Sequence, residues 1–134
     1  MLKSSGAPMT ARQHRVVFLD LAQIRLPVGA VTSILHRVSG VLLAVAIPVV
    51  AWAFARSLAN PAGFASVASW LANPIVKAAA VVWIWALSHH LLAGVRHMLS
   101  DVDVGSRLWY ARKSAYTVNV AAAVIALAAG AALW

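Results

Sequence analysis

Cysteine is absent from this chain of 134 residues. Its absence excludes disulfide bonds, iron–sulfur clusters held by cysteine and c-type haem attached through cysteine. It does not bear on groups that are bound through histidine, of which the sequence has five. No signal peptide is visible, because residues 1–17 are polar and basic and contain no apolar stretch of the required length. We therefore expect the first apolar span to be an uncleaved membrane helix.

Acidic residues are also scarce, with three Asp+Glu against 11 Lys+Arg and a formal net charge of +8. Hydrophobic residues make up 63% of the chain and charged residues only 10%. This composition excludes an ordinary soluble domain and indicates a membrane protein that forms one compact unit. In such a chain a basic excess favours membrane topology and contact with anionic lipid over nucleic-acid binding. The sequence also lacks the basic run with interleaved aromatic residues that is typical of a strand-binding groove.

Three apolar runs are long enough to cross a bilayer, for which about 20 apolar residues suffice. Residues 38–55 and 78–95 each contain 18 positions without a formal charge, and residues 114–134 contain no charge at all. The sequence therefore predicts an all-α integral membrane protein. The expected elements are transmembrane helices over about 30–56, 74–99 and 112–134, and a short interfacial helix near 61–72.

Asparagine–proline pairs predict where two of these helices begin, at Asn60-Pro61 and Asn73-Pro74. Pro48 is expected to kink the first span, which a membrane helix tolerates. The domain prediction is a basic cytoplasmic lead-in over residues 1–29 followed by a three-helix membrane anchor domain over residues 30–134.

The distribution of Lys and Arg predicts the orientation of the chain. Nine of the 11 basic residues lie in the N-terminal segment up to Arg37 or in and beside the second loop, and only Arg56 and Lys77 border the first loop. By the positive-inside tendency, the N-terminus and the second loop are cytoplasmic and the C-terminus is outside. His36 near the start of the first span and His90 of the second span can then face each other at similar depth.

The stretch Ser88–Asp101, SHHLLAGVRHMLSD, carries three of the five histidines. On a helix His90 shares a face with Gly94, and His97 lies on the same side about 10.5 Å further along. Buried ionisable groups in membranes are usually functional, and histidine is a common axial ligand of haem iron. We therefore interpret His90 as a haem ligand; the alternative is a histidine hydrogen-bonded to a neighbouring helix. His89 points about 100° away, so both cannot bind one iron.

Other polar residues border this stretch and have two interpretations each. His97 either bonds a haem propionate or is solvated. Arg96 and Asp101 form either a charge pair or a lipid contact, and a proton-transfer role for Asp101 has little support.

Ser33 and Arg37 are four residues apart on the first span and share a helix face. A cation and a hydroxyl at membrane depth can hold a polar headgroup in an apolar pocket. Alternatively, Arg37 extends to lipid phosphate and Ser33 bonds its own helix backbone. His36 beside Arg37 makes a positive site suited to carboxylates such as propionates. The second axial ligand is either His36 or a residue of another chain, and three helices offer little surface for a macrocycle, which favours an obligate partner.

Two motifs resemble those of the succinate dehydrogenase cytochrome b subunit family. Residues 33–40, SILHRVSG, resemble its S-I-x-H-R-x-[ST]-G signature, and the pattern from His90 through Gly94 and His97 to Asp101 resembles its second signature. Leu19-Asp20-Leu21 followed by Arg25-Leu26-Pro27 is similar to the proteobacterial form, which implies a multi-pass protein of the bacterial inner membrane with its C-terminus in the periplasm. The resemblance covers about residues 16–134, and the double histidine His89-His90 is a local variation.

This resemblance implies a membrane anchor of succinate:ubiquinone oxidoreductase, complex II, which links the citric acid cycle to electron transport. A second small anchor subunit shares one haem b with it, and an iron–sulfur subunit and a flavoprotein subunit dock on the cytoplasmic side. It implies His90 as the axial ligand with the other axial histidine from the partner anchor, His36, Arg37 and His97 near the propionates, and Ser33 and Arg37 at a ubiquinone site.

The dicarboxylate chemistry then belongs to the soluble subunits. Two rivals remain: an anchor of a fumarate reductase, and a structural or ion-conducting membrane protein without haem. A di-haem protein is disfavoured, because the third span contains no histidine.

Overall fold

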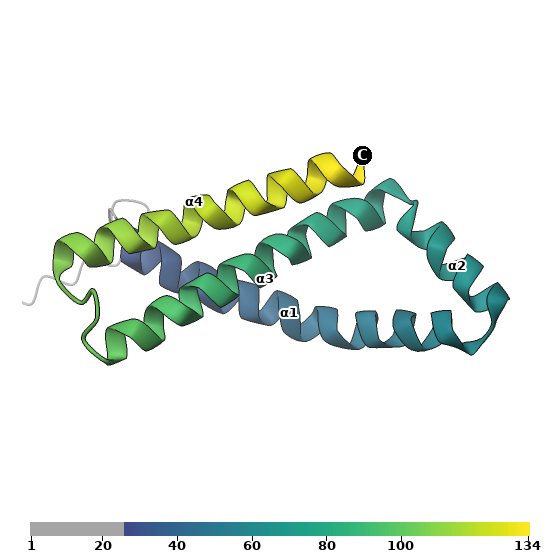
Figure 1. The fold of residues 1–134 in the computed structure, drawn as a ribbon, viewed down its shortest axis with the longest axis horizontal. Coiled ribbons are helices and arrows are strands. Elements are labelled where there is room, and N and C mark those ends of the chain that lie inside the picture. The colour runs from purple at the N-terminus through teal and green to yellow at the C-terminus, as the bar shows by residue number, and fades with distance from the viewer. Residues whose placement is uncertain (1–25) are drawn as a thin grey trace, which may run out of the picture.

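Four helices make up most of residues 26–134, which are the residues that the structure, a computed structural model, describes. In chain order they are α1 (Val28–Ala59), α2 (Pro61–Leu71), α3 (Pro74–Asp101) and α4 (Leu108–Leu133) (Figure 1). By length and apolar composition, α1, α3 and α4 can each cross a membrane. The prediction of an all-α protein with three spans and one short helix is confirmed. Most of the predicted basic lead-in lies outside the described residues.

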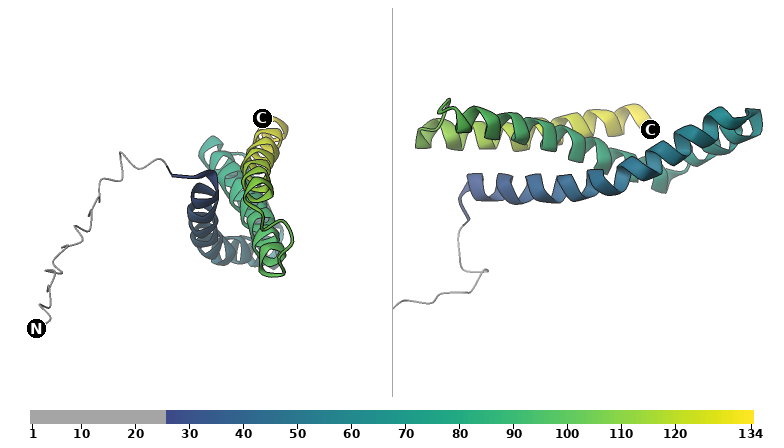
Figure 2. Two further views of the ribbon diagram at one scale, coloured as in Figure 1. Left: turned by 90° about the vertical axis from the view of Figure 1, so that its left-hand side faces the viewer. Right: turned by 90° about the horizontal axis from the view of Figure 1, so that it is seen from below.

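The long helices extend beyond the predicted spans at several ends. α1 begins at Val28 and ends at Ala59, and α4 begins at Leu108 and therefore includes Arg112 and Lys113 in its first turns. The predicted spans are sized to cross the hydrocarbon layer, but a helix continues past that layer as long as its backbone bonds are made. α1 runs through Pro48 without interruption and bends partway along its length (Figure 2).

The three long helices run alternately in opposite directions. The start of α1 and the turn between α3 and α4 lie at one end of the molecule, while α2 and the C-terminus lie at the other (Figure 1). At that second end the Lys77 ammonium donates to the carbonyl oxygen of Leu133 at 2.6 Å and lies over the Trp134 ring. The beginning of α3 is thereby attached to the end of α4.

Small side chains let α3 and α4 pack closely. Ala86 and Ala93 of α3 and Ala115 and Ala122 of α4 are buried almost completely. Small side chains allow the backbones of two membrane helices to approach closely. In lipid, where the hydrophobic effect does not drive helix association, the van der Waals contacts of these close backbones stabilise the pair. Most large apolar side chains point outward instead, as expected for a surface that meets lipid or other subunits.

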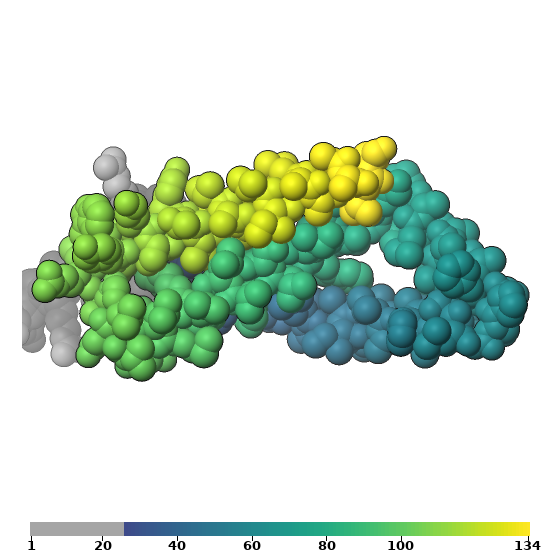
Figure 3. Space-filling view, in the orientation of Figure 1, coloured from purple at the N-terminus to yellow at the C-terminus, as the bar shows by residue number. Residues whose placement is uncertain are grey.

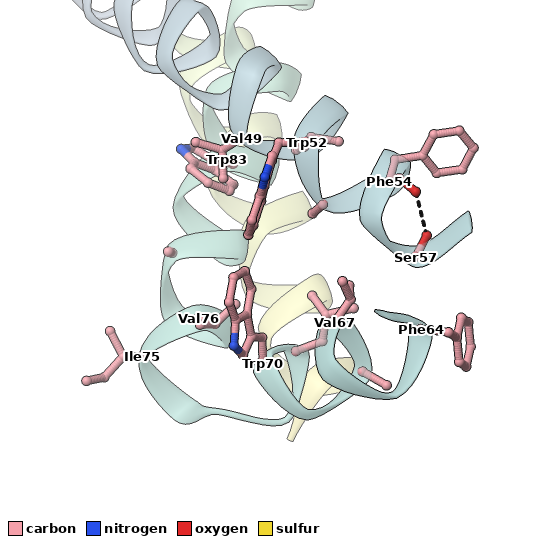
Figure 4. Close-up of a pocket in the computed structure, with 15 residues that line it drawn as sticks. Val49, Trp52, Phe54, Ser57, Phe64, Val67, Trp70, Ile75, Val76 and Trp83 are labelled. Atoms are coloured by element: carbon pink, nitrogen blue, oxygen red, sulfur yellow. Dashed lines mark hydrogen bonds between the residues drawn. The ribbon is translucent and has the colours of Figure 1, made fainter. Parts of the chain in front are cut away.

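α2 closes the open end of the α1–α3 pair, and the molecule is hollowed there (Figures 1 and 3). An apolar cavity of about 550 Å³ lies between α1, α2 and α3. The rings of Trp52 and Trp70 stack across it with centroids 5.1 Å apart, while Phe64 and Ile75 point outward (Figure 4). No titratable side chain lines this cavity, so the candidate chemistry must lie elsewhere.

Both predicted asparagine caps are confirmed. The Asn60 side chain accepts a hydrogen bond from the Gly63 amide at 2.7 Å, and the Asn73 side chain accepts one from the Ile75 amide at 2.8 Å. Each cap satisfies an amide that the first turn of a helix leaves without a partner. At Gly63 a Cβ atom would collide with the Arg56 carbonyl oxygen, so the sharp turn from α1 into α2 requires glycine at this position.

The Gly63→Ala variant should therefore be less stable, although alanine has the higher helix propensity by about 1 kcal/mol. We expect a lower apparent Tm of the detergent-solubilised protein, measured as the loss of helical circular dichroism on heating. Gly130→Ala is the matched control, because its Cβ would lie 3.8 Å from Val81, an ordinary contact. Equal Tm values for the two variants would contradict the requirement for glycine at the turn.

Candidate functional site

Three of the predicted histidines come together between α1 and α3. The rings of His36 and His90 stack with centroids 4.2 Å apart and an interplanar angle of 14°. His97, two turns further along α3, lies with its ring centroid 5.3 Å from that of His36. All three side chains are half-buried. The predicted convergence of the first span and the second span at similar depth is therefore present in the structure.

The orientation of the His90 ring is set by the backbone of α1. Its Nδ1 lies 3.1 Å from the carbonyl oxygen of His36 and 3.3 Å from the Ser39 hydroxyl. A carbonyl oxygen only accepts, so Nδ1 carries the proton and Nε2 of the neutral ring keeps its lone pair. Histidine ligands of metals are usually oriented in this way, with one nitrogen donating to a carbonyl and the other free to bind.

Gly40 makes this close approach possible. A Cβ atom at Gly40 would lie 3.0 Å from Cε1 of His90 and 3.4 Å from its Nδ1, which is tighter than nearly all real contacts. Ser39, one residue earlier, is fully buried and donates to the same His36 carbonyl oxygen at 2.9 Å. Ser39 and Gly40 thus form the surface of α1 on which the His90 imidazole of α3 packs.

The space beside Gly94 is occupied, although the sequence predicts that it is open. The sequence suggests an open face for a macrocycle next to this glycine, but the His36 ring is there, with its Nε2 3.7 Å from where a Cβ of residue 94 would be. Stacking uses the face of the His90 ring, whereas coordination uses the lone pair in its plane, so the two do not compete. Rings stacked face to face cannot bind one iron from opposite sides, and His36 is therefore not placed as the second ligand of an iron held by His90.

Ser33 and Arg37 lie on α1 one turn apart. Ser33 is half-buried and Arg37 is exposed. Within residues 26–134 neither side chain makes a hydrogen bond, so the alternative in which Ser33 bonds its own helix backbone is not observed there. It is Thr32 that bonds back to its helix, donating to the Val28 carbonyl oxygen at 3.0 Å. The hydroxyl and the guanidinium therefore lie on one face of the helix.

His89 has a different environment from His90. It is completely buried against α4, and its Nε2 lies 3.0 Å from the Asn119 side-chain oxygen. Thr32 of α1, also completely buried, lies 3.2 Å from the same oxygen. This oxygen only accepts, so Nε2 of His89 is its donor, and the buried Nδ1 has no partner within residues 26–134. Thr32, His89 and Asn119 form a polar cluster that joins all three long helices.

Arg96 is turned toward α4 as well. Its Nε donates to the Ser114 hydroxyl at 3.1 Å, and its Nη2 donates to the Ala111 carbonyl oxygen at 3.2 Å. Asp101 is exposed. Of the two interpretations for Arg96 and Asp101, the charge pair is not formed within the described part of the chain.

The residues present fit a cofactor for which this chain provides one histidine ligand. Residues 26–134 contain no cluster of three or more His, Cys, Asp or Glu side chains that could enclose a metal ion. One oriented imidazole beside two further histidines suits a haem iron whose other axial ligand comes from another chain. It does not suit a metal ion held by this chain alone.

Comparison with known proteins gives a family match and two relatives of similar length. Residues 11–129 match the family described as the succinate dehydrogenase/fumarate reductase transmembrane subunit. The succinate dehydrogenase cytochrome b556 subunit of Paracoccus denitrificans is 33% identical over 120 residues, which is 87% of this chain and 89% of that protein. The protein of the same description from Coxiella burnetii is 33% identical over 121 residues, 90% of this chain and 97% of that protein.

The sequence did not predict that Gly40 packs against the His90 ring, and it did not predict the cluster of Thr32, His89 and Asn119. A signal was present for Asn119, because a lone amide in an otherwise apolar span is expected to hydrogen-bond across helices. Gly40 is the last residue of the SILHRVSG motif, but the motif does not show that this glycine lies against His90, since that depends on which face of α3 packs on it.

Replacing Asn119 with leucine should destabilise the bundle, because it leaves Nε2 of the fully buried His89 without an acceptor, while Thr32 keeps the Val28 carbonyl oxygen at 3.0 Å. The expected loss is about 1–3 kcal/mol, the cost of an unsatisfied buried polar group. Denaturant unfolding in detergent micelles measures it. Thr117→Val is the control on the same helix, because Thr117 is exposed and bonds only its own helix at Lys113; a loss as large in the control would contradict the role of the cluster.

Proposed function

This chain belongs to the family of succinate dehydrogenase/fumarate reductase transmembrane subunits, and we propose that it binds one haem b jointly with a second anchor subunit and helps to form a ubiquinone-reduction site. The observation that carries the proposal is the orientation of His90. Its Nδ1 faces the His36 carbonyl oxygen at 3.1 Å, so its Nε2 is left to bind iron. Two relatives at 33% identity that are described as cytochrome b556 subunits support haem b as the cofactor.

The second axial ligand is a histidine of the partner anchor. His36 is stacked on His90 and cannot take this place, and α4 has no histidine. His36 and His97, with Arg37 next to His36 in the sequence, form the positive surroundings that suit the propionates. Haem supplies a one-electron redox centre when bound, and the role of this chain is to orient one ligand and to balance the propionate charge.

The quinone site uses Ser33 and Arg37. Reduction of ubiquinone adds two electrons and two protons, so negative charge develops on a quinone oxygen. The exposed Arg37 guanidinium stabilises this charge and the Ser33 hydroxyl donates to the other carbonyl. One turn of helix separates the two groups, and this lets them act on one small headgroup.

The remaining subunits dock at the end of the molecule where the α3–α4 turn lies. Among the described residues this end carries most of the Lys and Arg side chains, and the positive-inside tendency makes it cytoplasmic, with the C-terminus in the periplasm. An iron–sulfur subunit and a flavoprotein subunit bound there would oxidise succinate, since this chain has only three Asp+Glu residues and the two in residues 26–134, Asp101 and Asp103, are exposed. The names of the two relatives favour succinate oxidation over fumarate reduction as the reaction of the complex.

We expect His90→Ala to remove or shift the b-type absorbance of the purified complex, because the ligand nitrogen is lost. His89→Gln is the neighbouring control: its amide nitrogen can still donate to Asn119, and the spectrum should be retained. A normal spectrum in His90→Ala, together with a lost one in His89→Gln, would assign the ligand to His89 instead.

Replacing Arg37 or Ser33 with alanine should lower succinate-driven ubiquinone reduction, by roughly ten-fold or more for Arg37 given the strength of charged hydrogen bonds. Reduction of an artificial dye by succinate should be unchanged, since dyes accept electrons before the quinone site. Arg56→Ala serves as control, because Arg56 is an exposed arginine at the opposite end of the same helix. Intact ubiquinone turnover in both Arg37→Ala and Ser33→Ala would overturn the assignment.

A further inference from the structure

A groove of about 450 Å³ lies between the last turns of α3 and the first turns of α4. Its volume lies in the range of ligand pockets, roughly 300–1,000 Å³. The groove is at the end of the molecule opposite α2, beside the α3–α4 turn (Figure 1). None of the residues assigned above to haem or quinone lines it.

The end of the groove near the turn is cationic. Arg96 and Lys113 line it together with the Ser114 hydroxyl. Of the five N–H groups of the Arg96 guanidinium, two are used within residues 26–134 by Ser114 and Ala111, which leaves three in a side chain that is already held in place. These two hydrogen bonds hold the guanidinium at the α3–α4 contact. Its position is therefore already fixed before an anion binds.

Carboxylates do not neutralise this end of the groove. Among the described residues the acids are Asp101 and Asp103, which are exposed in and beside the α3–α4 turn, and neither lines the groove. Lys113 lies over the Trp109 ring at 5.0 Å, which holds the ammonium near the expected membrane surface.

Away from the turn the groove is mostly apolar, and it continues between Leu92 and Val95 of α3 and Val118 of α4. Thr117 also lines this part, and its hydroxyl donates to the Lys113 carbonyl oxygen of its own helix. A cationic end joined to an apolar channel along two membrane helices matches the two parts of a phospholipid. The apolar cavity beside α2 lacks such an end, since Ser57 is its one polar lining side chain.

We propose that this groove binds an anionic phospholipid. The lipid phosphate lies against Arg96 and Lys113, and one acyl chain lies along Leu92, Val95 and Val118. The positive-inside tendency places this end in the cytoplasmic leaflet, where anionic lipids attract basic residues at the membrane surface. Neither haem nor quinone binding is required for this site.

Native mass spectrometry of the complex purified with its accompanying subunits tests the proposal, with added phosphatidylglycerol compared with phosphatidylcholine. The wild-type complex should retain phosphatidylglycerol preferentially. Lys113→Gln should weaken this retention about five-fold, as expected for one surface charge. Arg112→Gln is the matched control, because Arg112 is the exposed neighbour that does not line the groove, and its retention should be unchanged. Equal loss in both variants, or equal retention of both lipids, would overturn the proposal in favour of diffuse charge attraction.

A second variant tests the apolar part without changing charge. Val95→Trp fills the channel and should reduce phosphatidylglycerol retention as Lys113→Gln does. If either variant fails to assemble, a photoreactive benzoyl-phenylalanine at Leu99, another groove residue, replaces this test. Cross-linking to lipid supports the proposal, and cross-linking to a protein subunit overturns it by showing that a partner fills the groove.

Discussion

The contact between the His90 imidazole and the backbone of α1 is the interaction on which the candidate site depends. The His36 carbonyl oxygen fixes the proton on Nδ1 of His90, and Gly40 leaves room for the ring at this distance. An imidazole held by backbone cannot rotate away without losing a hydrogen bond in surroundings where water does not replace it. The lone pair of the neutral ring is therefore on Nε2 and is held in one direction, which is what a metal ligand requires.

Contacts between α3 and α4, on the side of α3 away from His90, fix the rotation of α3 about its axis. His89 is adjacent to His90 in the sequence and points into the cluster with Thr32 and Asn119. Since neighbouring residues on a helix differ in direction by about 100°, fixing His89 against α4 also fixes His90 against α1. Arg96, two turns beyond His89, repeats the attachment to α4 near the turn. Of the two adjacent histidines, His89 therefore has a structural role and His90 is the candidate ligand.

The sequence predicted the helices well because apolar length, Asn–Pro caps and charge-free windows are local signals. It also indicated that His36 of α1 and His90 of α3 can face each other, because the charge distribution placed them at similar depth. It did not predict the stacking of His36 on His90, the packing of His90 against Gly40 or the polar cluster around Asn119. These features depend on how three helices are rotated and crossed, and a hydropathy pattern that is apolar nearly all round does not determine that rotation.

An experimental density map of the complex, purified with its other subunits, tests the central assignment most directly. The account predicts a haem iron bonded to Nε2 of His90, with Nδ1 of the same ring still facing the His36 carbonyl oxygen and the other axial position taken by a second chain. Iron bonded to His89, or a crevice between α1 and α3 that contains no haem, would contradict it.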